Sequence, residues 1–259
     1  MPPKTGVAVA SNVVNRSPSR RRLAPVRRDA AELLDQTGHD PAELAENLRD
    51  IRRVNLLAGG TRTILRALPA LLDPVPRDRD ATILDLATGS GDIPRAVVRW
   101  ARRQRRPVRI VASDLSEEIL VAAASHLGRL PEVTLARYDA RAVPLPDDSF
   151  DVVLCSLALH HFSPEDAVSV LREMDRLGRY GFILNDIRRG ALAYLAAWVS
   201  SRVATRNRLT RHDMPLSVLR AYSPDELKTL LAGAGIAGAT VSRHPLFRMT
   251  AVRGLRTED

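Results

Sequence analysis

The sequence predicts an α/β protein built around a mostly parallel β-sheet. Apolar runs alternate with helix-like segments from residue 82 onward, and the run 83–86 passes through a small-residue turn into a helix with Pro94 near its start. Proline presets a helical φ and lacks an N–H that the first turn of a helix does not need. Strand, tight turn and helix in this order form the repeating unit of doubly wound α/β proteins.

We expect strands, in chain order, at residues 82–86, 108–112, 133–138, 151–155 and 181–185, followed by strand-like runs at 239–242 and 247–252. The run 151–155 is almost entirely apolar, as a strand buried on both faces of a parallel sheet should be. The first helix after the turn is expected at 94–103. Later helices are expected to start at Ser163 and Ser223, each followed by a proline and acidic residues.

The first 76 residues have a different character. Residues 1–30 mix Pro, Ser, Asn and Arg without periodicity and predict a disordered basic tail. Residues 31–76 predict an N-terminal helical cap, with one helix from Asp40-Pro41 to near Gly59 and a second at 64–72. Residues 1–28 carry seven basic side chains and no acid, out of a net charge of +9, so the remainder is close to neutral.

The turn after the first strand is the strongest candidate for a ligand site. Gly89 and Gly91 allow the backbone to approach a ligand that any Cβ would block, and the helix behind them points free N–H groups at that ligand. Pro94 stands where a dinucleotide fingerprint has its third glycine, and Asp85 and Asp92 would repel a pyrophosphate. The turn therefore predicts a nucleotide-type cofactor that carries positive charge.

The stretch 83–94 resembles the first motif of class I methyltransferases, which bind S-adenosylmethionine (SAM), although Ala87 stands where the family's usual loop has a glycine. The resemblance covers residues 50–253. It implies a Rossmann-like class I methyltransferase fold, with a seven-stranded, mostly parallel sheet and a C-terminal antiparallel hairpin. Residues 77–259 are then the SAM-binding catalytic domain.

Asp114 ends the second strand, at the position that accepts hydrogen bonds from both ribose hydroxyls; its alternative interpretation is a helix cap. By the resemblance, Leu115 packs on adenine, and Asp139 with the Ala140 N–H reads the adenine edge. The segment 53–60 resembles the part of quinone-biosynthesis C-methyltransferases that closes the cofactor site, so Arg53 either pairs with the SAM carboxylate or is a solvated helix arginine. The predicted SAM-binding residues are Arg53, Asp85, Ala87, Thr88, Gly89, Ser90, Gly91, Asp114, Leu115, Asp139, Ala140 and Ser156.

The predicted catalytic residues follow the fourth and fifth strands. The chain resembles small-molecule O-methyltransferases that pair a histidine after strand four with an acid after strand five, as base and orienter. His160 or His161 would pair with Asp186 in this way. A phenol is mostly protonated at neutral pH, so a positioned base helps it attack the methyl carbon. The alternatives are structural histidines and a helix-capping Asp186.

An insertion at 187–222 predicts a helical lid over the acceptor, because long structureless loops are rare and those near sites often close over them. Its first half, 191–203, is an apolar helix-like segment, and its second half gathers polar residues around Pro215. His212 and Asp213 could orient each other and supply a second candidate base. The rival interpretation is a surface helix that pairs subunits in a homodimer or touches a membrane.

The sequence therefore predicts a SAM-dependent methyltransferase acting on a small hydrophobic acceptor, such as a phenolic or quinol oxygen or ring carbon. The alternatives are an RNA methyltransferase, which the tail and the arginines at 95–109 favour, and a non-catalytic SAM-binding partner protein. No metal is expected, because the histidines outside 160–161 are scattered. The single Cys155 and the shortness of the apolar segment 191–199 predict a cytoplasmic chain without stable membrane insertion.

Overall fold

The structure is a computed structural model that describes residues 25–255, so most of the predicted basic tail and residues 256–259 lie outside the described residues. One seven-stranded sheet has the order β3-β2-β1-β4-β5-β7-β6. Only β7 runs antiparallel to its neighbours, β5 and β6, which confirms the predicted parallel sheet with a C-terminal hairpin. The strands are β1 (Ala81–Leu86), β2 (Val108–Asp114), β3 (Val133–Arg137), β4 (Val152–Ser156), β5 (Phe182–Ile187), β6 (Thr240–His244) and β7 (Arg248–Arg253).

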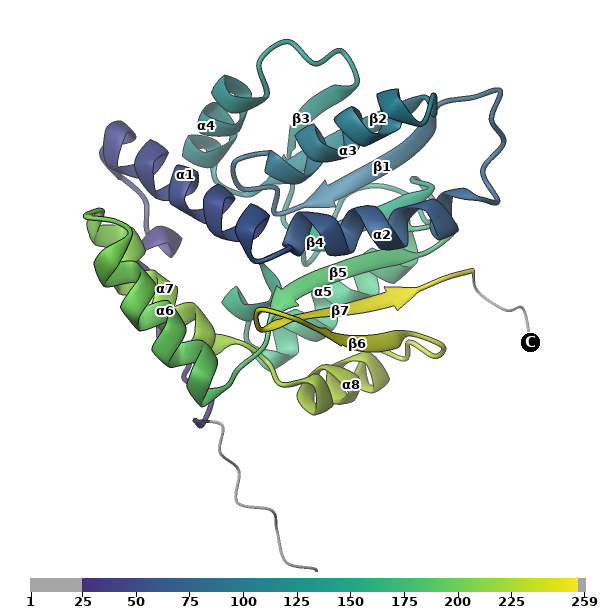
Figure 1. Ribbon diagram of the computed structural model, residues 1–259. Helices are drawn as coiled ribbons and strands as arrows, with labels where there is room; N and C mark the ends of the chain where they lie inside the picture. Colours follow the sequence, from purple (N-terminus) through teal and green to yellow (C-terminus); the bar gives the residue numbers. More distant parts are fainter. Residues whose placement is uncertain (1–24, 256–259) are drawn as a thin grey trace, which may run out of the picture.

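Helices cover both faces of the sheet (Figure 1). On one face α2 (Gly60–Leu72) and α3 (Asp92–Arg103) bury apolar side chains against the strands. On the other, α5 (Pro164–Leu177) and α8 (Pro224–Gly233) enclose a second apolar cluster. The helix α4 (Glu117–Leu127) contacts α3, β2 and β3. Because both faces are covered, β1, β4 and β5 are buried along nearly their whole length.

The elements beyond the carboxyl ends of the parallel strands are α1 (Pro41–Leu57), the short 3₁₀ helix η1 (Leu33–Asp35), the turn η2 (Leu159–His161) and the pair α6 (Ala191–Val203) and α7 (Arg208–Arg220) (Figure 1). The predicted cap 31–76 is therefore divided, because α2 belongs to a layer of the sheet while η1 and α1 pack on α7. Residues 25–30 also differ from the predicted tail. The Arg27 guanidinium donates to the carbonyls of Phe162 and Arg220, each at 2.8 Å.

The second half of the insertion is a helix, although the sequence predicts only a polar stretch around Pro215 there. Proline removes the N–H that would bond to the carbonyl four residues earlier, which normally breaks a helix. In α7 that carbonyl belongs to Arg211, and it accepts a hydrogen bond of 2.8 Å from the Arg202 guanidinium of α6. Asn207 caps the helix by accepting from the Thr210 N–H at 3.0 Å. The Arg202 contact comes from outside α7, which explains why the local sequence around Pro215 did not predict the helix.

Within residues 25–255, none of the helices combines the length and the apolar character needed to cross a lipid bilayer.

Candidate functional site

The glycine turn lies between β1 and α3, at the carboxyl edge of the sheet. Three of its residues have left-handed backbone: Ala87 with φ 51°, Gly89 with φ 53° and Gly91 with φ 72°. A Cβ on Gly91 would come within 2.8 Å of the Leu127 side chain, so this position requires glycine for space as well as for conformation. A Cβ on Gly89 would meet nothing within 4 Å, so the turn is open on that side. The turn is thus compact towards α4 and open beside Gly89.

Asp85 is a buried carboxylate directly beneath this turn. Its Oδ2 accepts a hydrogen bond of 2.6 Å from the Thr88 hydroxyl, while its Oδ1 has no hydrogen-bond partner among the described residues. Burial, opposed by the Thr88 hydrogen bond, raises the pKa of Asp85 to about 8. An orphaned buried oxygen is costly unless a ligand satisfies it. The turn therefore fits a cofactor with a cationic group, such as the SAM ammonium.

Asp114 connects the ends of β1 and β2. Its two carboxylate oxygens accept hydrogen bonds from the backbone N–H groups of Gly89 and Ser116, each at 3.1 Å. Burial raises its pKa above the usual value. The following helix is capped by the Ser116 hydroxyl, which accepts from the Ile119 N–H. The carboxylate therefore lies against the glycine turn, and the adjoining Leu115 side chain is half exposed.

The remaining predicted cofactor residues lie at the ends of β3 and β4. Asp139 is partly exposed and pairs with Arg141 at 2.7 Å, which lowers the pKa of its carboxyl group. Ala140 is buried beside it. The Ser156 hydroxyl accepts a hydrogen bond of 2.8 Å from the Asn185 side chain, which ties the end of β4 to that of β5. Together with the glycine turn, these residues follow the carboxyl edge from β3 to β5, where open α/β sheets bind ligands.

The contact between α1 and the glycine turn passes through a residue that the sequence analysis did not single out. The buried Asn55 side chain donates a hydrogen bond of 2.7 Å to Asp92, the first residue of α3. The Arg53 side chain is 65% exposed and lies 3.5 Å from Asp50, so its role towards SAM stays a prediction. Asn55 lies within the 53–60 segment, and that segment's resemblance was the one signal pointing to it.

His160 contacts Asp186, which is one of the two predicted pairings; the other was His161 with Asp186. Nδ1 of His160 lies 2.7 Å from the Asp186 carboxylate, which also accepts from the His160 backbone N–H at 3.0 Å. His161 instead lies 2.7 Å from Asp35 of η1, again through Nδ1. Although burial opposes a charged ring, Glu32 and Asp35 raise the pKa of His161 to about 9. The two histidines thus have different acid partners from different parts of the chain.

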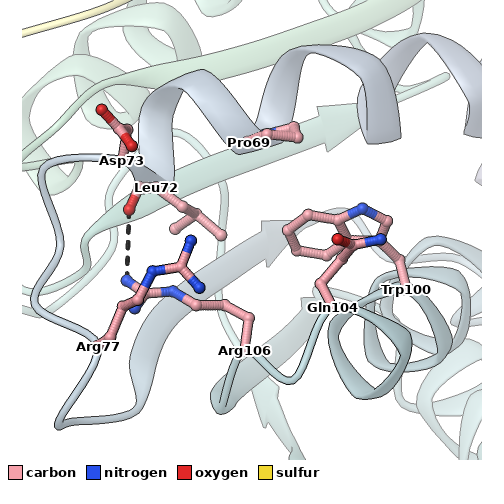
Figure 2. A pocket seen from close by; sticks show the side chains of 7 residues that line it. All are labelled: Pro69, Leu72, Asp73, Arg77, Trp100, Gln104 and Arg106. Carbon is pink, nitrogen blue, oxygen red and sulfur yellow. Dashed lines mark hydrogen bonds between the residues drawn. The ribbon is translucent and has the colours of Figure 1, made fainter.

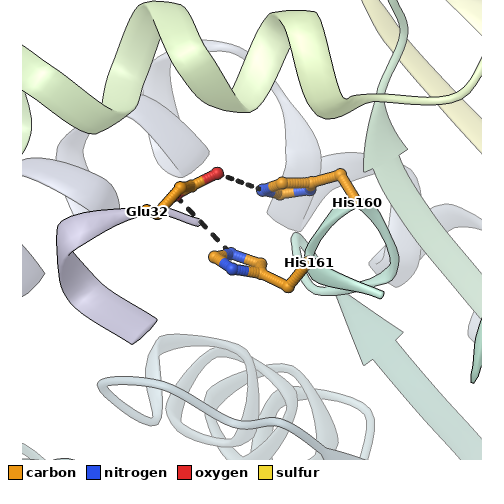
Figure 3. A group of neighbouring side chains, drawn as sticks. All are labelled: Glu32, His160 and His161. Atoms are coloured by element: carbon orange, nitrogen blue, oxygen red, sulfur yellow. Dashed lines mark ion pairs between the residues drawn. The ribbon is translucent and has the colours of Figure 1, made fainter. Parts of the chain in front are cut away.

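Glu32 completes this group from the N-terminal segment (Figure 3). Its carboxylate oxygens lie 3.9 Å from Nε2 of His160 and 3.8 Å from Nε2 of His161. The buried Arg220 of α7 supports the group by donating hydrogen bonds to the carbonyls of both histidines. The sequence analysis missed Glu32 and Arg220, because each is far along the chain from 160–161 and neither lies in a local motif.

His212 and Asp213 also contact each other, with Nδ1 2.7 Å from the carboxylate. The same carboxylate accepts hydrogen bonds from the backbone N–H groups of Leu33 and Leu34, at 2.9 and 3.0 Å. Asp213 therefore holds the start of η1 on α7, and the His212 side chain is half exposed. In the described structure this pair therefore joins η1 to α7.

Arg248, at the start of β7, is the largest fully buried side chain. None of its three guanidinium nitrogens has a hydrogen-bond partner among the described residues. Burial lowers its pKa to about 10, while Asp186 and Asp92 favour its charged form. It pairs in register with Ile187, just past Asp186 at the carboxyl end of β5. A buried cation without hydrogen bonds is costly and is expected to have an anionic partner in function.

A hollow of about 340 Å³, shown in Figure 2, lies at the opposite edge of the sheet from these groups. It lies between the C-terminal ends of α2 and α3 and is lined by Leu72, Trp100 and Arg106, among others. The Arg106 guanidinium is occupied by the carbonyls of Leu72 and Val75. This hollow is at the amino ends of the strands and does not belong to the candidate site.

Residues 83–181 match the protein family described as "Methyltransferase domain". The demethylmenaquinone methyltransferase of Thermus thermophilus is 26% identical over 215 residues, which are 76% of this chain and 90% of that protein. The ubiquinone/menaquinone biosynthesis C-methyltransferase UbiE of Escherichia coli is 30% identical over 106 residues, only 40% of each chain. The crystal structure of human N-acetylserotonin methyltransferase with SAM superposes with a TM-score of 0.60 at 15% identity, over 84% of this chain and 57% of its own.

Proposed function

We propose that the chain is a class I SAM-dependent methyltransferase and that it transfers the SAM methyl group to a small hydrophobic acceptor with an acidic oxygen, such as a phenol or quinol. The match of residues 83–181 to a methyltransferase domain and the similarity to a demethylmenaquinone methyltransferase support this proposal. SAM supplies an electrophilic methyl group on a sulfonium. The contribution expected of the protein is to hold that methyl group in line with the attacking oxygen or ring carbon and to stabilise the charge that develops there.

We assign SAM to the carboxyl edge around the glycine turn. Asp114 would accept hydrogen bonds from the ribose hydroxyls, and Leu115 would cover the adenine ring. The Asp139 carboxylate and the Ala140 N–H would read the adenine edge, which requires Asp139 to loosen its pair with Arg141. Asp85, through its orphaned Oδ1, would hold the cationic end of SAM near Ser156. Open space beside Gly89 supports this assignment.

The main support for an acidic acceptor is the environment of Arg248. Its buried, unpartnered guanidinium lies beside the end of β5, on the side of the sheet edge away from the adenosine residues of β2. An acidic phenol or quinol would bind there as the oxyanion, which also delocalises negative charge onto ring carbons. The relatives named for demethylmenaquinone and for ubiquinone and menaquinone support a quinol acceptor. Exposed Leu192, Leu195 and Trp198 on α6 support an apolar entry at the same end.

This proposal does not require a histidine as the base. Nε2 of both His160 and His161 faces Glu32, and Asp213 anchors η1 beside His212. Among the predicted catalytic residues, Asp186 is the one that we assign to the acceptor end of the site. It orients His160 and lies near Arg248. A phenol held against a buried guanidinium loses its proton more readily than it does in water, since the cation favours the charged form.

Several arginines behind the RNA alternative already have intramolecular partners. Arg102 pairs with Glu132 at 2.7 Å, and Arg109 pairs with Asp80 at 2.6 Å. Arg95 and Arg106 donate to backbone carbonyls. Phosphate binding draws on basic side chains that are free to replace counterions, so these contacts support the small-molecule acceptor.

The first test of the proposal is to incubate the full chain with methyl-labelled SAM and an extract of the source cells. We expect the label in the organic phase, on a lipophilic phenol or quinol, and we expect at least about 100-fold less label with an Asp114→Ala variant at low SAM concentration. Nuclease-sensitive label in the acid precipitate would reject the proposal in favour of the RNA alternative. SAM binding without any transfer would instead favour a non-catalytic partner protein.

We also expect SAM affinity to depend on pH through Asp85. Its pKa of about 8 means that the free protein carries a protonated Asp85 below pH 8, and this proton must leave before the carboxylate can pair with SAM. Affinity should therefore rise with pH, by about 20-fold between pH 6 and pH 7.5, where the SAM ammonium is still mostly charged. Calorimetric titration across this range measures the slope. An Asp85→Asn variant should bind weakly with no such slope, and an equal slope in the variant would disprove the assignment.

A further inference from the structure

Two imidazoles and one carboxylate converge in the buried group around Glu32 (Figure 3). One ligand atom from each of Glu32, His160 and His161 can be chosen so that all three lie within 4.8 Å of one another. Glu32 and His160 are buried, and His161 is only partly exposed. The nearest approaches, 3.8 and 3.9 Å from the imidazole Nε2 atoms to the carboxylate, are too long for direct hydrogen bonds.

We propose that Glu32, His160 and His161 bind a divalent transition-metal ion of the Zn²⁺ type. Two histidines and a glutamate are a donor set that Zn²⁺ uses, with bonds of about 2.0–2.2 Å. Tetrahedral geometry then places neighbouring donor atoms about 3.3 Å apart. The two histidine–Glu32 separations therefore need to close by about half an ångström on metal binding, and the separation between the two histidine donor atoms is at most 4.8 Å.

The outer contacts of both histidines match those of metal ligands. Nδ1 of His160 lies 2.7 Å from Asp186, and Nδ1 of His161 lies 2.7 Å from Asp35. A carboxylate on Nδ1 fixes the ring tautomer and leaves the Nε2 lone pair free for a metal, as in carboxylate–histidine–zinc arrangements. Both Nε2 atoms then point at the same third residue, Glu32, which makes the arrangement more than a chance pair of histidines.

The charges around the group also favour a cation. Three carboxylates, from Glu32, Asp35 and Asp186, contact or approach the two rings. One guanidinium, that of Arg220, lies 3.9 Å from Glu32 and 3.0 Å from Asp35, and it is largely occupied by backbone carbonyls. A divalent ion bound between the Nε2 atoms and Glu32 would lie close to these three carboxylates, which favour a cation there.

This site would join parts of the chain that are remote in sequence. Glu32 precedes η1, whereas His160 and His161 form η2 after β4. A metal ion would fasten the N-terminal segment over the carboxyl edge of the sheet, where Arg220 and Asp213 already hold it. Its three protein ligands would leave a fourth position for water. The inference does not depend on the identity of the methyl acceptor.

The test is metal binding by the tag-free, full-length chain after treatment with a chelator. We expect one Co²⁺ per chain, with the visible absorption of a low-symmetry site, and displacement of Co²⁺ by one equivalent of Zn²⁺. Glu32→Gln and His161→Asn should each weaken Zn²⁺ binding by at least about 100-fold, and Asp35→Asn by about 10- to 100-fold. His212→Asn is the matched control, because it removes another histidine with a carboxylate on Nδ1 and should leave the affinity unchanged.

Thermal unfolding separates metal binding from misfolding of the variants. Zn²⁺ should raise the unfolding temperature of the wild-type chain and of His212→Asn, and should leave that of Glu32→Gln unchanged. Absence of stoichiometric binding by the wild-type chain would overturn the proposal. Equal affinity in the wild type and both ligand variants would also overturn it, because the ion would then be bound elsewhere.

Discussion

Replacing Asp114 by alanine is expected to weaken SAM binding by at least about 100-fold, because each hydrogen bond from a ribose hydroxyl to a carboxylate contributes about 1.5–3 kcal/mol. The carboxylate is held in place by the backbone N–H groups of Gly89 and Ser116, so it needs little reorganisation to accept from a ligand. Methyl transfer at low SAM concentration should fall by the same factor. Isothermal titration with SAM and a steady-state assay measure the two effects.

The control for this substitution is Asp80→Ala. Asp80 is also an acid beside a strand, but it precedes β1 at the opposite edge of the sheet and pairs with Arg109 on the surface. It should leave SAM affinity within about twofold, since exposed ion pairs contribute about 0–1 kcal/mol. A circular dichroism melt confirms that both variants fold. Nearly wild-type SAM affinity in a folded Asp114→Ala chain would contradict the assignment of the ribose to this acid.

The fold and the position of the glycine turn at the carboxyl edge of the sheet could be predicted because their signals are local in sequence. Pro94 and the glycines define a strand–turn–helix within a dozen residues, and Asp114 follows at the spacing that a second parallel strand imposes. Apolar parallel strands must be covered on both faces, so a layer of helices is expected on each side of the sheet. The pairing of His160 or His161 with Asp186 was predicted from the resemblance to small-molecule O-methyltransferases, and the structure brings His160 to Asp186 at the ends of the neighbouring strands β4 and β5.

The remaining features depend on contacts between distant segments. Glu32 has no motif around it, and it becomes informative only when η1 packs against α7 and places it between two histidines. Pro215 predicts a break in α7, but an arginine from α6 occupies the carbonyl that the proline leaves free. Arg248 belongs to a short strand in which an arginine normally points to solvent. In each case tertiary structure overrides the local pattern.

Replacing Arg248 by methionine is expected to lower kcat/KM for the acceptor by about 100-fold, while SAM affinity stays within about threefold. The loss reflects one charge-assisted contact to the acceptor oxyanion, which is worth about 1.5–3 kcal/mol. The same change should raise the free energy of unfolding by about 1–4 kcal/mol, because it removes a buried charge that has no hydrogen-bond partner in the described structure. Steady-state kinetics, SAM titration and urea unfolding measure these three quantities.

The opposite signs of these effects make the prediction specific. If Arg248 were purely structural, its replacement would lower the free energy of unfolding. If it bound SAM, its replacement would weaken SAM binding rather than slow turnover of the acceptor. Arg243→Met is the matched control, since Arg243 is exposed on the neighbouring strand β6 and its loss should change neither stability nor kinetics appreciably. A stabilised but poorly active Arg248→Met chain would mean that the protein keeps an unfavourable buried charge for the sake of its acceptor. A destabilised chain with normal turnover would contradict the oxyanion role.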